Sequence, residues 1–471
     1  MQRIVKEKSF YKNVLAIALP IALQNFIVFA TSMMDTIMLG SVGETLLSAS
    51  ALANQPFFIL SLVCFGLSGG ATVLASQYWG KRDMASIRMI FSIVLKAAFF
   101  ISAILGLAVL LAPETVMGLY SKNPEIIAEG TKYLRIIGFA YFFFGVGNTL
   151  LCSIRSIELV KISVVVNSSS FVTNVFLNWV LIFGNLGAPA MGIRGAAIAT
   201  LTARILEFVI TMVYILFIDK RLQMRVRDLF RFDKVFARDL LVYGTPVLLN
   251  EVMWSLGITL QAALLGHIEY SSGDPVAANS VTSMVQQLST IVIFGIANAA
   301  AVMVGKAIGE KDLETAERRA HTLKYMSFIV GAAACLIILL LRSVAVDFYN
   351  IPEASKALAR DMMVVMAVVT FFVSISSISI VGILRGSGDT RFCLTVEMIS
   401  LWLVALPLAF LASMVFHWPV PIVLLLMKID EPLKSLLCMI RMRGRKWMKS
   451  VARDFDRESP ASEPAAEPAA E

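Results

Sequence analysis

Polar and apolar positions alternate along this 471-residue chain on the scale of whole helices. Apolar segments of bilayer-spanning length are separated by short polar segments. A helix rises about 1.5 Å per residue, so about 20 apolar residues cross the hydrocarbon core. The pattern therefore predicts an all-α membrane protein with twelve transmembrane helices, although the segment 276–305 carries several polar residues. The predicted helices lie near 14–39, 46–77, 89–112, 133–154, 162–184, 193–218, 241–266, 276–305, 322–346, 361–384, 393–416 and 418–441.

The second half of the chain repeats landmarks of the first half at a nearly constant separation. Each half holds six predicted helices, an even number, so both halves insert into the membrane in the same direction. This predicts two pseudo-symmetric six-helix lobes related by an axis along the membrane normal, an architecture of secondary transporters. The matched positions are Pro20 with Pro246, Asp35 with Gln261, Gly40 with Gly266, Gly80 with Gly309 and Arg155 with Arg385.

The repeat and the polar segments predict the domain organisation. We expect an N-terminal lobe at 1–218, a basic linker at 219–240, a C-terminal lobe at 241–445 and a tail at 446–471. From Glu458 the tail is a low-complexity run of proline, alanine and glutamate with nothing apolar to bury, so we expect a disordered extension.

Composition and charge agree with a membrane protein. Hydrophobic residues make up 58% of the chain and charged residues 16%, too few to cover the surface of a soluble protein of this size. The net charge of +8 could suggest nucleic-acid binding. However, lysine and arginine gather in alternate loops, as the positive-inside rule requires. The expectation is a multi-pass protein of the plasma membrane with both termini in the cytoplasm and no nucleic-acid partner.

One carboxylate lies deep in the first predicted helix. A charge in the hydrocarbon core costs at least ~2.5 kcal/mol, so Asp35 should face protein or a water-filled cavity. Asp35 shares a helical face with Gln24 and Thr31. Either it binds a proton or another cation, which we favour, or it is tied down by neighbouring amides and only fixes helix packing.

Polar side chains also gather in the fifth and seventh helices. Asn174 and Asn178 share a face, and their oxygens could bind Na⁺ or join a network around Asp35; alternatively, they only link helices by hydrogen bonds. Glu251 is the other deep carboxylate, beside Asn250, and it could equally be a structural acid. We expect Arg385 to pair with Asp389, and Lys428 with Asp430 and Glu431.

Several motifs resemble those of the MATE (multidrug and toxin extrusion) family of transporters. The resemblance runs from about Phe10 to Trp447. It implies two six-helix lobes around a central cavity that opens alternately to each side. It also implies a cation-coupled antiporter that exports organic, often cationic and amphipathic, compounds in exchange for H⁺ or Na⁺. The motifs are Met34-Asp35-Thr36-Ile37-Met38-Leu39-Gly40, the run from Leu177 to Gly184, the run from Gly192 to Thr200, and Leu384-Arg385-Gly386-Ser387-Gly388-Asp389-Thr390.

The chain falls between two branches of that family. In the DinF-like branch, the position of Asn178 is often an aspartate, whereas an amide cannot take up a proton. The NorM-like branch has a seventh-helix glutamate one turn after Glu251 and a tenth-helix aspartate where this chain has Ser374. Glu251 is the only substitute for that missing acid. We therefore expect cation binding or coupling at Asp35, Asn174, Asn178 and Glu251, with Na⁺ at the first three as one option. The substrate cavity is expected at Gln24, Thr31, Met34, Asn250, Trp254, Gln261 and Ser374.

Two other functions fit the sequence less well. A lipid-linked saccharide flippase of the same superfamily would need several arginines within its helices to hold a pyrophosphate, and only Arg204 qualifies. A membrane-embedded enzyme would need clustered metal ligands or a nucleophile–base pair. His267, His321 and His417 are far apart in sequence. We therefore expect a monomeric transporter of small organic molecules, not an enzyme, without a cofactor or resident metal.

Overall fold

The computed structural model describes residues 4–268, 274–347 and 352–454, and in these ranges the regular structure is helical. Eleven helical segments in this part of the chain are long and apolar enough to cross a membrane. The first half contains α1 (Lys8–Gly40), α2 (Glu44–Ala53), α3 (Gln55–Gly80), α4 (Met84–Leu111), α5 (Pro113–Tyr120), α6 (Pro124–Ser153), η1 (Ile154–Ile157), α7 (Lys161–Phe183), η2 (Asn185–Gly187), α8 (Ile193–Val213), η3 (Tyr214–Ile218) and η4 (Val226–Phe230).

The second half follows the same plan with more interruptions. Three of its short segments, η5, η6 and η7, are π-helical turns inside longer helices. It contains α9 (Lys234–Gly266), α10 (Pro275–Gly309), α11 (Leu313–Asp347), α12 (Glu353–Ser377), η5 (Ile378–Leu384), α13 (Thr390–Glu397), η6 (Met398–Ala405), α14 (Leu406–Phe410), η7 (Leu411–Val415), α15 (Val420–Met427) and α16 (Asp430–Arg441).

α10, a helix with many small and polar residues, lies between the two halves of the molecule. α10 packs against α1 and α3 as well as against α11 and α12, so it contacts both halves. Of its most apolar 18-residue window, 78% is buried. A helix surrounded by protein rather than lipid can carry polar side chains, which explains the several polar residues in 276–305.

The last predicted helix is divided in two. α15 ends at Met427 and α16 begins at Asp430, and the Lys428 ammonium between them donates to Gln261 Oε1 at 2.8 Å. The expected pairing of Lys428 with Asp430 and Glu431 is wrong. Lys434 contacts those carboxylates instead, at 2.7 and 3.3 Å, and also Glu397 at 2.9 Å. The sequence holds two lysines near these acids, and the helical turn from Asp430 brings Lys434 alongside them.

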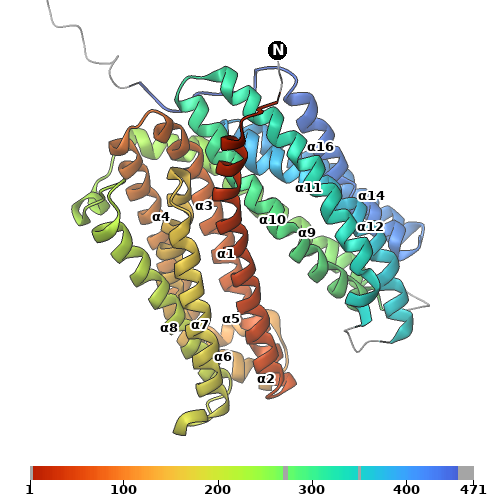
Figure 1. Cartoon of the computed structure of the whole chain (residues 1–471). Helices are drawn as coiled ribbons and strands as arrows, with labels where there is room; N and C mark the ends of the chain where they lie inside the picture. Colours follow the sequence, from red (N-terminus) through yellow and green to blue (C-terminus); the bar gives the residue numbers. More distant parts are fainter. Residues whose placement is uncertain (1–3, 269–273, 348–351, 455–471) are drawn as a thin grey trace, which may run out of the picture.

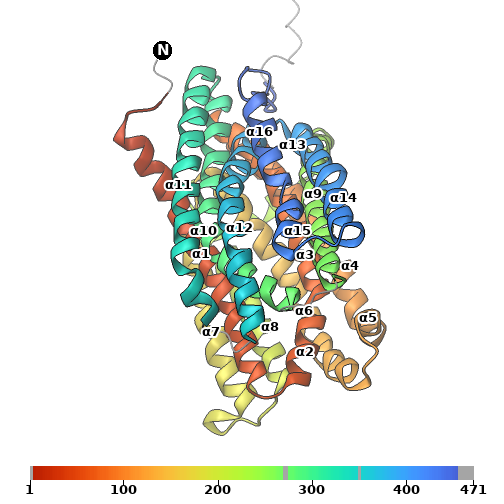
Figure 2. The same cartoon turned by 90° about the vertical axis from the view of Figure 1, so that its right-hand side faces the viewer.

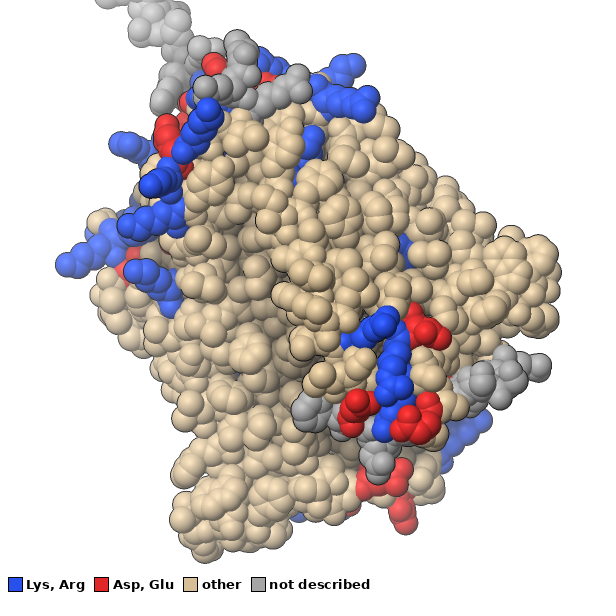
Figure 3. Space-filling view, turned by 45° about the vertical axis from the view of Figure 1, so that its right-hand side comes forward, with Lys and Arg blue, Asp and Glu red and all other residues tan. Residues whose placement is uncertain are grey.

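The two halves form two groups of helices that meet at one end and splay apart toward the other (Figure 1). The view turned by 90° shows the same end carrying the N-terminal residues and the end of α16 (Figure 2). We call this the closed end, where α3 and α10 end at Gly80 and Gly309. We call the opposite one the splayed end, where α1 and α9 end at Gly40 and Gly266. Lysine and arginine gather at the closed end above a broad surface with few charges, and a smaller group of mixed basic and acidic residues lies toward the splayed end (Figure 3).

Glycines allow the halves to approach closely near the closed end. A methyl group on Gly70 of α3 would lie 2.6 Å from the Cα of Gly244 of α9. A methyl group on Gly309 of α10 would collide with the backbone of Gln77 of α3. Small residues at helix contacts are the usual means of close packing in membranes.

The segment after α16 crosses from one half to the other at the closed end. We call residues 443–454 the C-terminal strap. Its Trp447 is 1% exposed, and the Gln77 carboxamide bonds the strap backbone twice, donating to Lys449 O at 3.0 Å and accepting from Val451 N at 2.8 Å. Residues 446–454 of the predicted tail are therefore packed, because backbone contacts anchor them. Residues 455–471 lie outside the described part.

Candidate functional site

A chain of polar side chains surrounds Asp35 near the splayed end. Asp35 lies five residues before the end of α1, and Asn174 and Asn178 lie one turn apart on α7. Asn178 Nδ2 donates to Asp35 Oδ1 at 2.5 Å and to Asn174 Oδ1 at 3.1 Å. Asn174 Nδ2 donates to Thr200 Oγ1 of α8 at 3.3 Å. The structure therefore brings together the three residues for which a cation site was expected.

The charges around Asp35 leave its carboxylate without a fixed counter-ion. Arg204 of α8 is near enough to attract Asp35 electrostatically, but its guanidinium is paired with Glu207 at 2.8 Å. Arg204 also lies 5.1 Å from the ring centre of Phe144. Among the described residues, no ion pair is formed by Asp35.

The Asp35 site also contains a buried carboxamide oxygen, that of Asn178. Asn178 Oδ1 is buried and has no hydrogen-bond partner within the described ranges. Carboxylate and carboxamide oxygens, such as those of Asp35, Asn174 and Asn178, are the kind of ligand that hard cations bind. Asp35 itself is partly exposed, whereas Asn174 and Asn178 are 1% and 0% exposed. The carboxylate of Asp35 is therefore the most exposed of the three polar groups, and the two asparagines lie behind it.

The other expected residues of the first helix lie apart from this site. Gln24 precedes Asp35 by eleven residues, about 16 Å along the helix. Its Oε1 accepts from Arg155 Nη2 at 2.7 Å. Thr31 Oγ1 donates to the Ile27 carbonyl at 2.8 Å, and Met34 packs against the apolar core of the first half.

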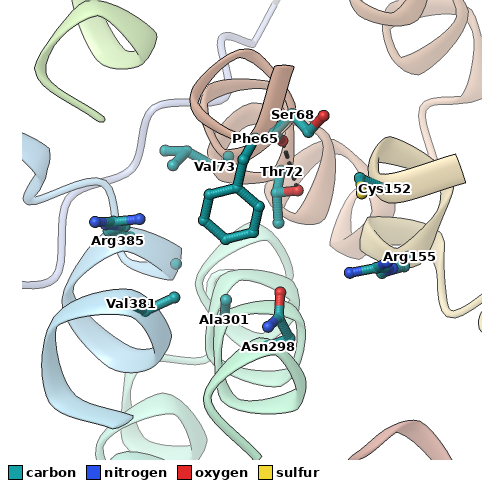
Figure 4. Close-up of a pocket in the computed structure, with 12 residues that line it drawn as sticks. Phe65, Ser68, Thr72, Val73, Cys152, Arg155, Asn298, Ala301, Val381 and Arg385 are labelled. Atoms are coloured by element: carbon teal, nitrogen blue, oxygen red, sulfur yellow. Dashed lines mark hydrogen bonds between the residues drawn. The ribbon is translucent and has the colours of Figure 1, made fainter. Parts of the chain in front are cut away.

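A second polar centre lies between the two halves. Arg155 and Arg385, which the repeat relates to each other, project from opposite sides toward a cavity of about 30 Å³, with Asn298 between them (Figure 4). That volume holds a water molecule. Both arginines are buried, and each is bound within its own half, Arg155 by Gln24 and Arg385 by Glu251 at 2.6 Å. We call this the inter-lobe cavity.

Glu251 therefore differs from Asp35 in its electrostatic state, because Arg385 neutralises it. The expected pairing of Arg385 with Asp389 is wrong. Asp389 bonds to Arg441 at 2.8 Å and to Lys449 of the strap at 2.6 Å. Only a Gly-Ser-Gly turn separates Arg385 from Asp389 in the sequence, but their side chains bind different partners.

The remaining expected residues belong to the second half. Gln261 is buried and bonds to Met427 O and Lys428, so it points into that half. Ser374 Oγ donates to Ser327 O at 2.9 Å between two packed helices. Asn250 is 3% exposed and has a carboxamide oxygen without a partner in the described ranges, while Trp254 is half-buried.

The residues that sequence reasoning missed are those of the inter-lobe cavity, Arg155, Arg385 and Asn298. A signal was present, because Arg155 and Arg385 are matched positions of the repeat. Each follows the end of an apolar run, a place that predicts a loop. In the structure both side chains turn back between the halves instead of entering solvent.

Comparison with known proteins identifies similar chains. The family model described as MatE matches residues 20–180 and 246–411, one stretch in each half. The chain is 24% identical to a probable multidrug resistance protein NorM of Thermotoga maritima, covering 93% of each chain. It is 23% identical to the transporter YisQ of Bacillus subtilis, covering 88% of this chain and 90% of that one. Its fold is similar to the outward-facing conformation of a multidrug resistance transporter of the MOP superfamily, with a TM-score of 0.83 and 18% identity, covering 92% of this chain and 96% of that one.

Proposed function

The chain belongs to the MatE family of membrane transporters, and we propose that it is a cation-coupled antiporter that exports organic compounds by alternating access. The observation that carries the proposal is the Asp35 site. It is a partly exposed carboxylate inside a membrane helix with two buried asparagines and, among the described residues, no ion pair. A carboxylate kept in such a place at a cost of at least ~2.5 kcal/mol is a functional site by default.

The polarity of the molecule supports the direction of transport. By the positive-inside rule, the closed end with its lysines and arginines faces the cytoplasm. The Asp35 site then lies in the half of the membrane nearer the outside, and the splayed end opens outward. A cation that enters from outside would meet Asp35 first in this conformation.

The proposed cycle uses the charge of Asp35 as a switch. With Asp35 ionised, the site attracts a cationic or amphipathic organic compound. Arrival of H⁺ or Na⁺ neutralises the carboxylate, weakens that attraction and allows the two halves to rearrange. One charge moving down a potential of 100 mV supplies about 2.3 kcal/mol, enough for a concentration ratio of about fifty.

The test relocates the carboxylate within its site. In proteoliposomes with a cation gradient, we expect D35N to lose at least ~90% of coupled transport of a fluorescent organic cation, because an amide cannot be neutralised by a cation. The double variant D35N/N178D returns a carboxylate to a position that lies 2.5 Å from the original one. We expect it to recover a measurable part of the coupled transport.

The control is the single variant N178D. It adds a second carboxylate beside Asp35, so it reports whether an acid on α7 harms the fold by itself. Melting temperature in detergent checks that all variants are folded. Undiminished coupled transport by folded D35N would contradict the proposal.

A second candidate is a flippase for a lipid-linked saccharide, and the inter-lobe cavity is the observation that favours it. Arg155 and Arg385 line that cavity, and arginines suit a pyrophosphate. However, Glu251 already neutralises Arg385. One uncompensated arginine is a weak anchor for a doubly charged group, so we rank this function second. Transport that responds to neither a proton nor a sodium gradient would favour it.

A further inference from the structure

A groove at the closed end has walls from both halves of the molecule. One wall is formed by the start of α7 and the end of η3, and the other by α10 and α11, with α1 along its side. Its volume is about 570 Å³, within the range of small-molecule sites. We call it the basic groove. It is separate from the Asp35 site and from the inter-lobe cavity, which have other lining residues.

The charge of the basic groove is strongly positive. Lys161, Lys220, Arg221, Lys306 and Arg319 line it, against the two carboxylates Glu158 and Asp219. Lys306 is committed to Glu158, with 2.8 Å between ammonium and carboxylate. Arg319 donates to the Met303 carbonyl at 3.1 Å, and Asp219 accepts from the Leu222 amide at 2.7 Å.

Three cations of the groove have no committed partner. Within the described ranges, no ion pair or side-chain hydrogen bond is formed by Lys161, Lys220 or Arg221. Their side chains are exposed, yet they line one concave site. Three like charges held together repel one another, and an anion bound among them would relieve that repulsion.

The same groove is bordered by apolar surface at membrane depth. Ala16 and Ile218 line it and are exposed. Nearby in the sequence, Leu19 of α1 is 66% exposed and Phe217 of η3 is 78% exposed, which is the exposed apolar surface expected of a border that faces lipid. A ligand that fits both features carries a phosphate at one end and an acyl chain at the other.

We propose that the basic groove binds one anionic phospholipid of the cytoplasmic leaflet. Its phosphate is held by Lys161, Lys220 and Arg221, and its chains lie along α1 and η3. Basic pockets between transmembrane helices on the cytoplasmic side recognise anionic headgroups in this way. Lys306 and Arg319 of the other half form the opposite wall of the groove, so the bound lipid lies between the halves while the closed end is shut. The inference does not depend on the coupling ion or the substrate.

The linker provides a matched control for this site. Arg225 and Arg227 lie on the same basic linker as Lys220 and Arg221, are exposed like them, and do not line the groove. K220A/R221A and R225A/R227A therefore remove the same charge from the same segment. Only the first pair removes it from the proposed site.

The experiment measures lipid binding to the purified, delipidated transporter by native mass spectrometry and by melting temperature. We add phosphatidylglycerol, phosphatidylcholine or inorganic phosphate. For the wild type we expect retention of phosphatidylglycerol and a raised melting temperature, with little effect of the other two. K220A/R221A should bind phosphatidylglycerol about thirtyfold more weakly, since each of the two basic residues contributes about 1 kcal/mol. R225A/R227A should bind like the wild type.

Three results would overturn the proposal. The first is equal loss of binding in both double variants, which indicates general attraction to a basic surface. The second is inorganic phosphate that competes as well as phosphatidylglycerol, which indicates an anion site without a lipid. The third is unchanged binding in folded K220A/R221A. If that variant does not fold, K161A replaces it, because Lys161 is exposed at the start of α7.

Discussion

At the scale of single residues, the two deep carboxylates have different environments. Asp35 has amide partners, and none of the described residues forms an ion pair with it. Glu251 lies 2.6 Å from Arg385. In the second half, the position matched to Asp35 is Gln261, which already holds the ammonium of Lys428 at 2.8 Å. The ammonium of Lys428 thus lies beside the position of the second half that corresponds to Asp35.

The two matched arginines allow a prediction about stability. E251A leaves Arg385 as an unpaired buried charge, so we expect a loss of about 3–5 kcal/mol. Q24A removes only a hydrogen bond from Arg155, so we expect about 1.5–3 kcal/mol. The melting temperature in detergent should fall further for E251A than for Q24A.

The control for this prediction is the double variant E251A/R385A. It removes both charges, and its melting temperature should lie above that of E251A. If E251A and E251A/R385A melt together, the ion pair does not stabilise the fold, and Glu251 would have to be reconsidered as a second coupling acid.

At this scale, side-chain contacts could be predicted from the sequence where the residues lie on neighbouring turns of one helix. Asn174 and Asn178 share a face of one helix, and the structure places them beside Asp35 as expected. Gln24 shares a face with Asp35 too, but a face extends over the whole helix, so Gln24 reaches Arg155 instead. The partners of Asp389 are not predictable from the local turn, because they come from α16 and the strap.

At the scale of elements, the C-terminal strap holds the closed end together. Asp454 bonds to Lys81 after α3 at 2.7 Å and to Lys311 after α10 at 2.8 Å. These two lysines lie in the matched turns of the repeat, one in each half. Arg453 bonds to Asp239 of α9 at 2.6 Å. The strap therefore links both halves at the end that would have to open in the other conformation.

Removing Asp454 should loosen this link. In D454A, both lysines lose their shared carboxylate, and we expect faster hydrogen–deuterium exchange of the amides of Lys449, Val451 and Arg453. The control is D347A, which removes the ion pair between Asp347 and Arg360 toward the splayed end. Equal exchange of the strap in wild type and D454A would contradict its role.

The acid sensitivity of this link follows from the pKa of Asp454. Hydrogen bonds from Lys311 and then Lys81 hold that pKa at about 2, below the ordinary 3.8. A carboxyl whose pKa is lowered in the folded protein contributes fully to stability above its ordinary pKa. That contribution is lost as the pH falls through the pKa of the folded state. The ion pairs of Asp454 should therefore be unchanged between about pH 5 and 8 and be lost only as the pH falls from about 4 to about 2. Any pH dependence of transport near neutrality must arise elsewhere.

The sequence predicted the helices well and the strap poorly, for physical reasons. A transmembrane helix must be long and apolar to span the bilayer, so its pattern is visible. The strap is bound partly through its backbone, by Gln77, Lys81 and Ser387, and partly by ion pairs with residues far away in sequence, and neither kind of contact leaves a local pattern. The break between α15 and α16 was missed because its lysine binds a residue 167 positions away.

At the scale of the whole molecule, the repeat predicted two lobes but not which end is shut. Both conformations of an alternating-access transporter use the same helices, so the sequence pattern is the same for each. The structure is closed at the basic end, where α3 packs on α9 and α10. Close approach there depends on glycines such as Gly70 and Gly309, while the Asp35 site lies toward the other end.

The most direct measurement of the proposed coupling imposes one gradient at a time. Purified wild-type protein in liposomes, oriented by side-specific labelling, receives either a proton or a sodium gradient, and accumulation of a fluorescent organic cation is followed. We predict accumulation against its own gradient under at least one of the two. For D35N we predict none under either gradient, although D35N still exchanges substrate at equilibrium. Wild-type transport indifferent to both gradients, or D35N transport equal to wild type, would contradict coupling through Asp35.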